Sequence, residues 1–162
     1  MSLRPWPSPT RNRDETEAEK LDRNWNDMLQ ELRVMQTGTQ LIAGFLLTLP
    51  FTDRFAELTG LEEATYLGLV LLSGLTLAVI LAPISIHRRL FGERVKDRLV
   101  SAAHRLMVVA LTLVGVLITA IIVFIFQVVI GTTVALAVGA GVALVVVALL
   151  VVLPIVILPR RT

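Results

Sequence analysis

The chain has 162 residues, of which 55% are hydrophobic and 17% are charged, below the roughly 25% charge of a soluble domain. It contains no cysteine, which excludes disulfides and cysteine-ligated metal sites. The net charge is only +2, and the basic residues are distributed in a way that sets membrane topology, so we expect no nucleic-acid binding.

The N-terminal segment has two parts. Residues 1–13 contain Pro5, Pro7 and Pro9, and they are predicted to be a disordered tail. Residues 14–33 begin with acidic side chains, which favour a helix N-terminus, and place one apolar stripe on an amphipathic helix: Leu21, Trp25, Met28, Leu29 and Leu32. Two alternatives remain open. The helix lies on the membrane surface, or it continues into the first span and packs its stripe on another subunit.

A first membrane span is predicted at residues 34–51, which carry no charge. Its polar side chains share one face, which includes Gln36, Thr37, Gln40 and Thr48. Glutamine in hydrocarbon is unfavourable unless it hydrogen-bonds to another helix. We therefore expect this intramembrane polar face to point into the bundle or into an assembly interface.

Three further spans are predicted at about residues 64–86, 106–130 and 132–158. The uncharged stretch from residue 106 to 158 is too long for one span, and Gly131 marks a tight turn between two helices. The predicted fold class is therefore an all-α membrane protein, a four-transmembrane-helix bundle at residues 34–162 with an N-terminal amphipathic cytoplasmic helix.

The fourth span carries small residues at four-residue spacing, a pattern that permits close helix packing: Gly131, Ala135, Gly139 and Ala143. This small-residue ridge could serve an interface between copies. It could equally seat the fourth span against the third within one chain.

Orientation follows from the basic residues, which are concentrated on the cytoplasmic side of bacterial membranes. Fourteen of the fifteen Lys and Arg residues lie in the N-terminal segment, the second loop or the C-terminal tail. The first loop carries only Arg54 among several carboxylates. Both termini are therefore predicted to be cytoplasmic.

The cytoplasmic ends of the first three spans contain the densest polar chemistry. In a compact bundle, these side chains could meet in a buried network that fixes helix register: Glu31, Arg33, Gln36, His87, Arg88, His104 and Arg105. Three arginines of the second loop could also contact anionic lipid headgroups: Arg94, Arg98 and Arg105. Two histidines without a carboxylate cluster do not indicate a metal site.

Several segments resemble a family of small four-span bacterial membrane proteins that is catalogued as a domain of unknown function. The resemblance rests on residues 29–34, on Gln36-Thr37-Gly38 with Gln40, and on later segments around Ala82-Pro83, His87-Arg88 and His104-Arg105. It covers roughly Trp25 to Pro159. It implies a four-span protein of the bacterial plasma membrane, and some members carry the label sodium:proton antiporter.

The residues themselves favour a different class. A proton- or sodium-coupled carrier is expected to hold an ionisable group near the bilayer midplane, and no span contains one. No nucleophile–base pair, metal set or phosphate loop indicates an enzyme or a cofactor. We expect a non-enzymatic subunit or scaffold that acts through helix interfaces, with the bilayer, another copy or another membrane protein as partner. A small oligomeric transporter or channel is the alternative.

Overall fold

The structure is a computed structural model that describes residues 16–90 and 96–157. The chain order is α1 (Glu17–Thr48), two 3-10 turns η1 (Leu49–Phe51) and η2 (Asp53–Glu57), and α2 (Gly60–Leu90). Then come α3 (Lys96–Val129), α4 (Thr132–Val147), a π-helical turn η3 (Ala148–Val152) and α5 (Leu153–Ile157). The predicted tail at residues 1–13 lies outside the described residues.

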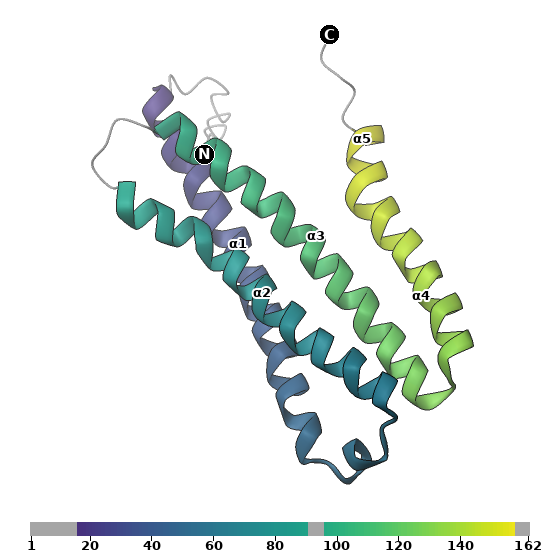
Figure 1. Cartoon of the computed structure of the whole chain (residues 1–162). Coiled ribbons are helices and arrows are strands. Elements are labelled where there is room, and N and C mark those ends of the chain that lie inside the picture. Colours follow the sequence, from purple (N-terminus) through teal and green to yellow (C-terminus); the bar gives the residue numbers. More distant parts are fainter. Residues whose placement is uncertain (1–15, 91–95, 158–162) are drawn as a thin grey trace, which may run out of the picture.

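Four helical stretches are long and apolar enough to cross a membrane: Asp22–Phe51, Gly60–Ile86, Ala103–Val129 and Thr132–Ile157. They lie side by side as long rods, with the short turns at the two ends of the molecule (Figure 1). We call the end where α1 begins, α2 ends and α3 begins the basic end. The opposite end, which holds η1, η2 and the α3–α4 turn, is the acidic end.

Helix α1 begins with a capping box. The Thr16 hydroxyl accepts from the Glu19 backbone N–H, while the Glu19 carboxylate accepts from the Thr16 backbone N–H at 2.8 Å. These bonds hold the pKa of Glu19 below its ordinary value. From this cap the helix runs without interruption to Thr48. The N-terminal amphipathic segment and the first apolar stretch are therefore one helix.

The amphipathic stripe of α1 is partly buried within this chain: Met28 and Leu29 are half-buried, and the side chain of Leu21 lies outside the described residues. Trp25 is 8% exposed and Leu32 is 2% exposed, and Leu32 packs against Ile80 of α2 and Ala110 of α3. The same face continues through the apolar half of the helix at alternating spacings of three and four residues: Met35, Thr39, Ile42 and Leu46. This is the spacing of a helix that packs along a single seam, and Trp25 and Leu32 are covered by it without another subunit.

Helices α2 and α3 supply matching seams. The buried residues of α2 follow the same alternation: Tyr66, Leu69, Ser73, Thr76, Ile80 and Pro83. Those of α3 include Ala103, Met107, Ala110, Leu117 and Phe124. The three seams meet along one axis, and the core of the protein is therefore a three-helix bundle of α1, α2 and α3.

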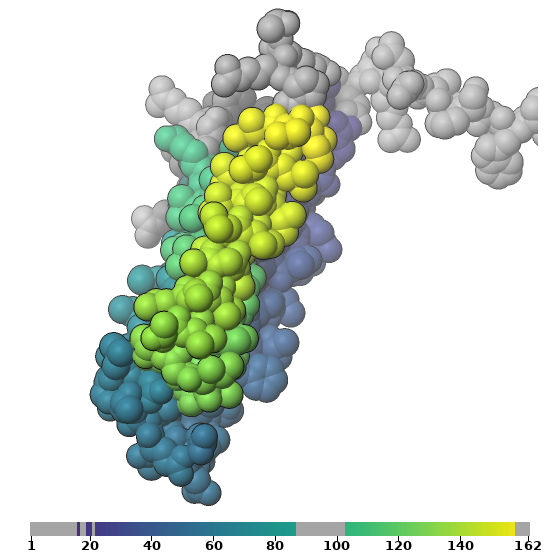
Figure 2. All heavy atoms as spheres, turned by 90° about the vertical axis from the view of Figure 1, so that its right-hand side faces the viewer, coloured from purple at the N-terminus to yellow at the C-terminus, as the bar shows by residue number. Residues whose placement is uncertain are grey.

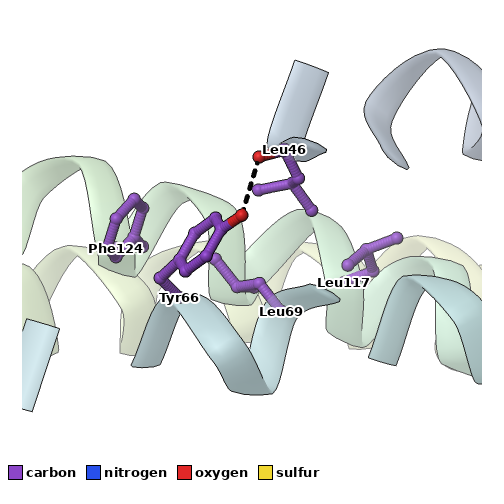
Figure 3. Close-up of a cluster of buried hydrophobic side chains, with 5 residues drawn as sticks. All are labelled: Leu46, Tyr66, Leu69, Leu117 and Phe124. Carbon is purple, nitrogen blue, oxygen red and sulfur yellow. Dashed lines mark hydrogen bonds between the residues drawn. The ribbon is translucent and has the colours of Figure 1, made fainter. Parts of the chain in front are cut away.

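The acidic end of this bundle is anchored by Tyr66. Its hydroxyl donates to the backbone carbonyl of Leu46 at 3.0 Å (Figure 3). Its ring packs edge-on against Phe55. Residue 50 is proline, which has no N–H to continue the helical ladder onto that carbonyl. Tyr66 therefore bonds a carbonyl at the point where α1 ends.

Helix α4 packs on α3 and lies across one side of the molecule (Figures 1 and 2). The turn that reverses the chain is as short as the sequence predicts, and Gly131 adopts φ +115°, a conformation that favours glycine. Near its other end this helical rod contains the π-helical turn η3, and Pro154 follows two residues after that turn. Proline has no N–H to donate to the carbonyl four residues earlier, that of Leu150, which lies within this turn.

Candidate functional site

A polar crevice lies at the basic end, between α1 and α3. It is lined by Asn24, Asp27, Met28, Glu31, His104, Arg105 and Met107, and its volume is about 720 Å³. Acidic groups come from α1, and the histidine and arginine come from α3. The sequence-predicted residues Glu31, His104 and Arg105 are therefore brought to one place by the contact between these two helices.

The predicted buried network does not form around Glu31. Glu31, His104 and Arg105 are all exposed. Within the described part of the chain, no ion pair or hydrogen bond joins the Glu31 carboxylate to another side chain. An exposed carboxylate remains hydrated, so burial does not force it to find a partner. The crevice is an open, mixed-charge surface instead of a buried register-fixing core.

Arg33 and Gln36 do not belong to the crevice. Arg33 lies two residues beyond Glu31, which turns it about 200° around a helix of 3.6 residues per turn. It is exposed on the other side of α1, and Gln36 is half-buried. The side chains of His87, Arg88 and Arg98 lie outside the described residues, as does Arg94 altogether. Of the three arginines predicted to meet anionic lipid, only Arg105 can be placed, and it lines the crevice.

The intramembrane polar face of α1 points away from the bundle. Thr37, Gln40 and Thr48 are exposed, whereas the core seam of α1 runs through Thr39. Of the two alternatives predicted for this face, the bundle interior does not hold Thr37, Gln40 or Thr48 in a single copy, and the assembly interface stays a prediction. The reason is that residues 25, 28, 32, 35, 39, 42 and 46 give a more apolar seam, and the chain buries that one.

The polar groups on this face differ in whether they already have a hydrogen-bond partner. The Thr37 hydroxyl donates to the Arg33 carbonyl at 3.0 Å, and the Thr48 hydroxyl donates to the Phe45 carbonyl at 2.7 Å. These hydroxyls are satisfied within their own helix. The amides of Gln36 and Gln40 have no hydrogen-bond partner among the described residues. An unpaired amide in an apolar medium costs about 2–7 kcal/mol.

The small-residue ridge of α4 seats that helix on α3. Ala135 is 1% exposed and Gly139 is buried. A Cβ atom at Gly139 would lie 2.3 Å from Cγ2 of Val123, closer than real side chains approach. Gly115 of α3 is packed in the same way against Val146 and Leu150. Of the two roles predicted for the ridge, the structure shows packing within one chain.

A second cavity, of about 470 Å³, lies at the acidic end between α1, the 3-10 turns and α3. Its lining is almost entirely apolar and includes Ile42, Leu46, Phe55 and Phe124, with Arg54 as its charged member. Arg54 is already paired with Glu57 at 2.7 Å. The cavity is suited to an apolar group such as an acyl chain.

Among the described residues, three buried polar side chains were not singled out by sequence reasoning: Thr39, Ser73 and Thr76. Gln127, which the sequence predicts to lie at the outer interface of the third span without a role, is buried as well. Ser73 and Thr76 donate to carbonyls of their own helix, those of Val70 and Leu72. They are small enough to let the three core helices approach closely. The signal that could have found them is their position in the seams of alternating three- and four-residue spacing. Within residues 16–90 and 96–157, no three metal-ligating side chains gather.

These features define an all-helical protein with four helices of membrane-spanning length, three of which form the core. The chain belongs to a family of unknown function, DUF6328, which it matches over residues 14–154. This match begins before the first turn of α1, so the whole of that helix belongs to the family unit. No curated protein and no solved structure gives a significant match.

Proposed function

We propose that this chain is a non-enzymatic subunit or scaffold of the bacterial plasma membrane, which acts through contacts between helices. The observation that carries the proposal is the division of polar groups in the bundle. In the core seam of α2 the hydroxyls of Ser73 and Thr76 bond carbonyls of their own helix, while the amide of Gln40 lies exposed on the outside of α1. Hydrogen-bonding capacity is thus offered to a partner in the membrane.

In this proposal the basic end is cytoplasmic, because basic residues are retained on that side. The first half of α1, from Glu17 to Arg33, then forms an amphipathic extension that projects from the membrane by about 25 Å at 1.5 Å per residue. Its crevice beside α3 is available to a cytoplasmic partner or to anionic headgroups. The lipid bilayer covers the remaining apolar surface of α4.

A small oligomeric transporter or channel is the second candidate. It is favoured by the outward placement of Gln40 and Thr48, with Gln36 half-buried beside them, since several copies could arrange that face around a shared axis. The label sodium:proton antiporter, which the sequence resemblance attaches to some members, points to the same class. Transport would then depend on assembly, because the polar face of one copy is on its outside.

Reconstitution separates the two candidates. The full chain is purified in mild detergent, its co-purifying proteins are identified, and it is then placed in vesicles loaded with a pH-sensitive or sodium-sensitive dye. For a subunit or scaffold, we expect ion flux equal to that of protein-free vesicles. Sustained flux that the exposed-site variant Gln40→Leu reduces would overturn the proposal in favour of the second candidate.

A further inference from the structure

Helix α1 carries a second seam on its outer side. Residues at alternating spacings of four and three form it, and every one is exposed: Asn26, Gln30, Arg33, Thr37, Gln40 and Gly44. We call this set the outer seam. Its spacing is that of a helix that packs lengthwise against another helix. Its composition is polar or small throughout, in contrast to the core seam of the same helix.

Lipid acyl chains cannot satisfy the hydrogen-bonding groups of this seam at Gln40. That residue lies seven positions beyond Arg33, or about 10 Å further along the helix axis into the apolar stretch. Acyl chains offer no hydrogen-bonding groups, and the Gln40 amide has no partner within the part of the chain described. Thr37 and Thr48 make no such demand, because their hydroxyls bond their own helix.

We infer that the outer seam of α1 docks against the outer seam of a second copy of this chain, with the two α1 helices parallel. The inference rests on the proposed function and specifies one of its helix contacts. A side-chain amide is both a donor and an acceptor, so a glutamine can bond to an identical glutamine. Copies in one membrane share one orientation, so a two-fold axis along the membrane normal places both Gln40 residues at the same depth.

The neighbouring position allows the helices to approach. Gly44 lies one turn beyond Gln40, it is exposed, and a Cβ atom built there meets nothing within 4 Å. Two parallel helices can therefore come close beside the glutamines, as small residues permit in membranes. At the other end of the seam, Arg33 lies at the edge of the apolar stretch, where its long side chain can reach the headgroups.

Cysteine cross-linking tests this arrangement directly, because the chain has no cysteine of its own. Gly44→Cys places a thiol on the outer seam. Gly38→Cys is a matched control, because Gly38 is also exposed on α1 with nothing within 4 Å of its Cβ position, but it lies about 120° around the helix. Mild oxidation of native membranes should link Gly44→Cys into a species of twice the chain mass and leave Gly38→Cys monomeric.

The contribution of the Gln40 amide to dimer stability is tested with Gln40→Leu, which removes the amide from an exposed position. We expect its dimer dissociation constant, measured by energy transfer between labelled full chains in vesicles, to rise about 3- to 20-fold. Thr48→Val is the control, because its hydroxyl bonds Phe45, and its dissociation constant should change less than twofold.

Equal cross-linking at both positions, a cross-link to a protein of another mass, or unchanged association of Gln40→Leu would each overturn the inference. Its failure is distinct from failure of the proposed function. A dimer that conducts ions overturns the scaffold role and leaves the seam standing. A monomer that conducts none overturns the seam alone.

Discussion

The hydroxyl of Tyr66 makes a buried hydrogen bond that joins two helices of the core, α2 and α1. It reaches a carbonyl of α1 next to Pro50, where the helical ladder loses a donor. The same carbonyl accepts from the backbone N–H of Leu49, so the Tyr66 hydroxyl supplies a second, buried donor. Single residues of this kind determine how the end of one helix is held against its neighbour.

Replacing Tyr66 with Phe should therefore lower the free energy of unfolding by about 1 kcal/mol, the typical net value of a hydrogen bond. The ring and its packing on Phe55 and Phe124 remain. Thermal unfolding of the full chain in mild detergent provides the measurement. Thr65→Val on the same helix removes a hydroxyl that bonds its own backbone, and it serves as the control. Equal effects of the two variants would contradict the role given to Tyr66.

Glu31 shows the opposite situation. The sequence predicts a buried network of Glu31 with arginines and histidines, but in the folded chain Glu31 is exposed at the edge of the crevice. Exposed charges contribute about 0–1 kcal/mol even when they are paired. The carboxylate is therefore better suited to contact with a partner than to holding the helices in register.

At the scale of the helices, the contact between α3 and α4 depends on glycines, which have no side chain to hold the two helices apart. Gly139 of α4 lies against Val123, and Gly115 of α3 lies against Val146 and Leu150. Each helix supplies a glycine where the other supplies a branched side chain. Because α4 packs on α3, this contact decides where the fourth helix lies.

Gly139→Ala should destabilise this contact by about 1–3 kcal/mol, because the added methyl group overlaps Val123. Gly141 is the matched control, since a Cβ atom there meets nothing within 4 Å and alanine is the better helix former. Unfolding of both variants in detergent, followed by circular dichroism, gives the comparison. If Gly139→Ala is as stable as Gly141→Ala, the close approach of α3 and α4 is not present in the protein.

At the scale of the whole molecule, the orientation in the membrane is the property on which the proposed function depends. Single cysteines test it in the cysteine-free chain. Ala56→Cys lies in η2 at the acidic end, and Asn24→Cys lies at the basic end; both positions are exposed. An impermeant maleimide should label Ala56→Cys in intact cells, and it should label Asn24→Cys only after the membrane is opened. The reverse pattern would contradict the assignment of the basic end to the cytoplasm.

The sequence alone determined the helical class, the four long apolar helices and the tight turn at Gly131. Each of these depends on local properties, namely the length of apolar runs, the distribution of charge and the backbone freedom of glycine. Family membership also came from the sequence, since the match over residues 14–154 agrees with the resemblance drawn from its motifs.

Only the tertiary structure decided which faces meet. Helix α1 has an apolar seam through Leu32 and a polar seam through Gln40, and a single sequence does not state which one the other helices cover. The chain buries the apolar seam against α2 and α3, because apolar contact and close packing favour it. That choice turns Gln40 outward and leaves Glu31 exposed, and the fold seats Gly139 of α4 on α3 within one chain.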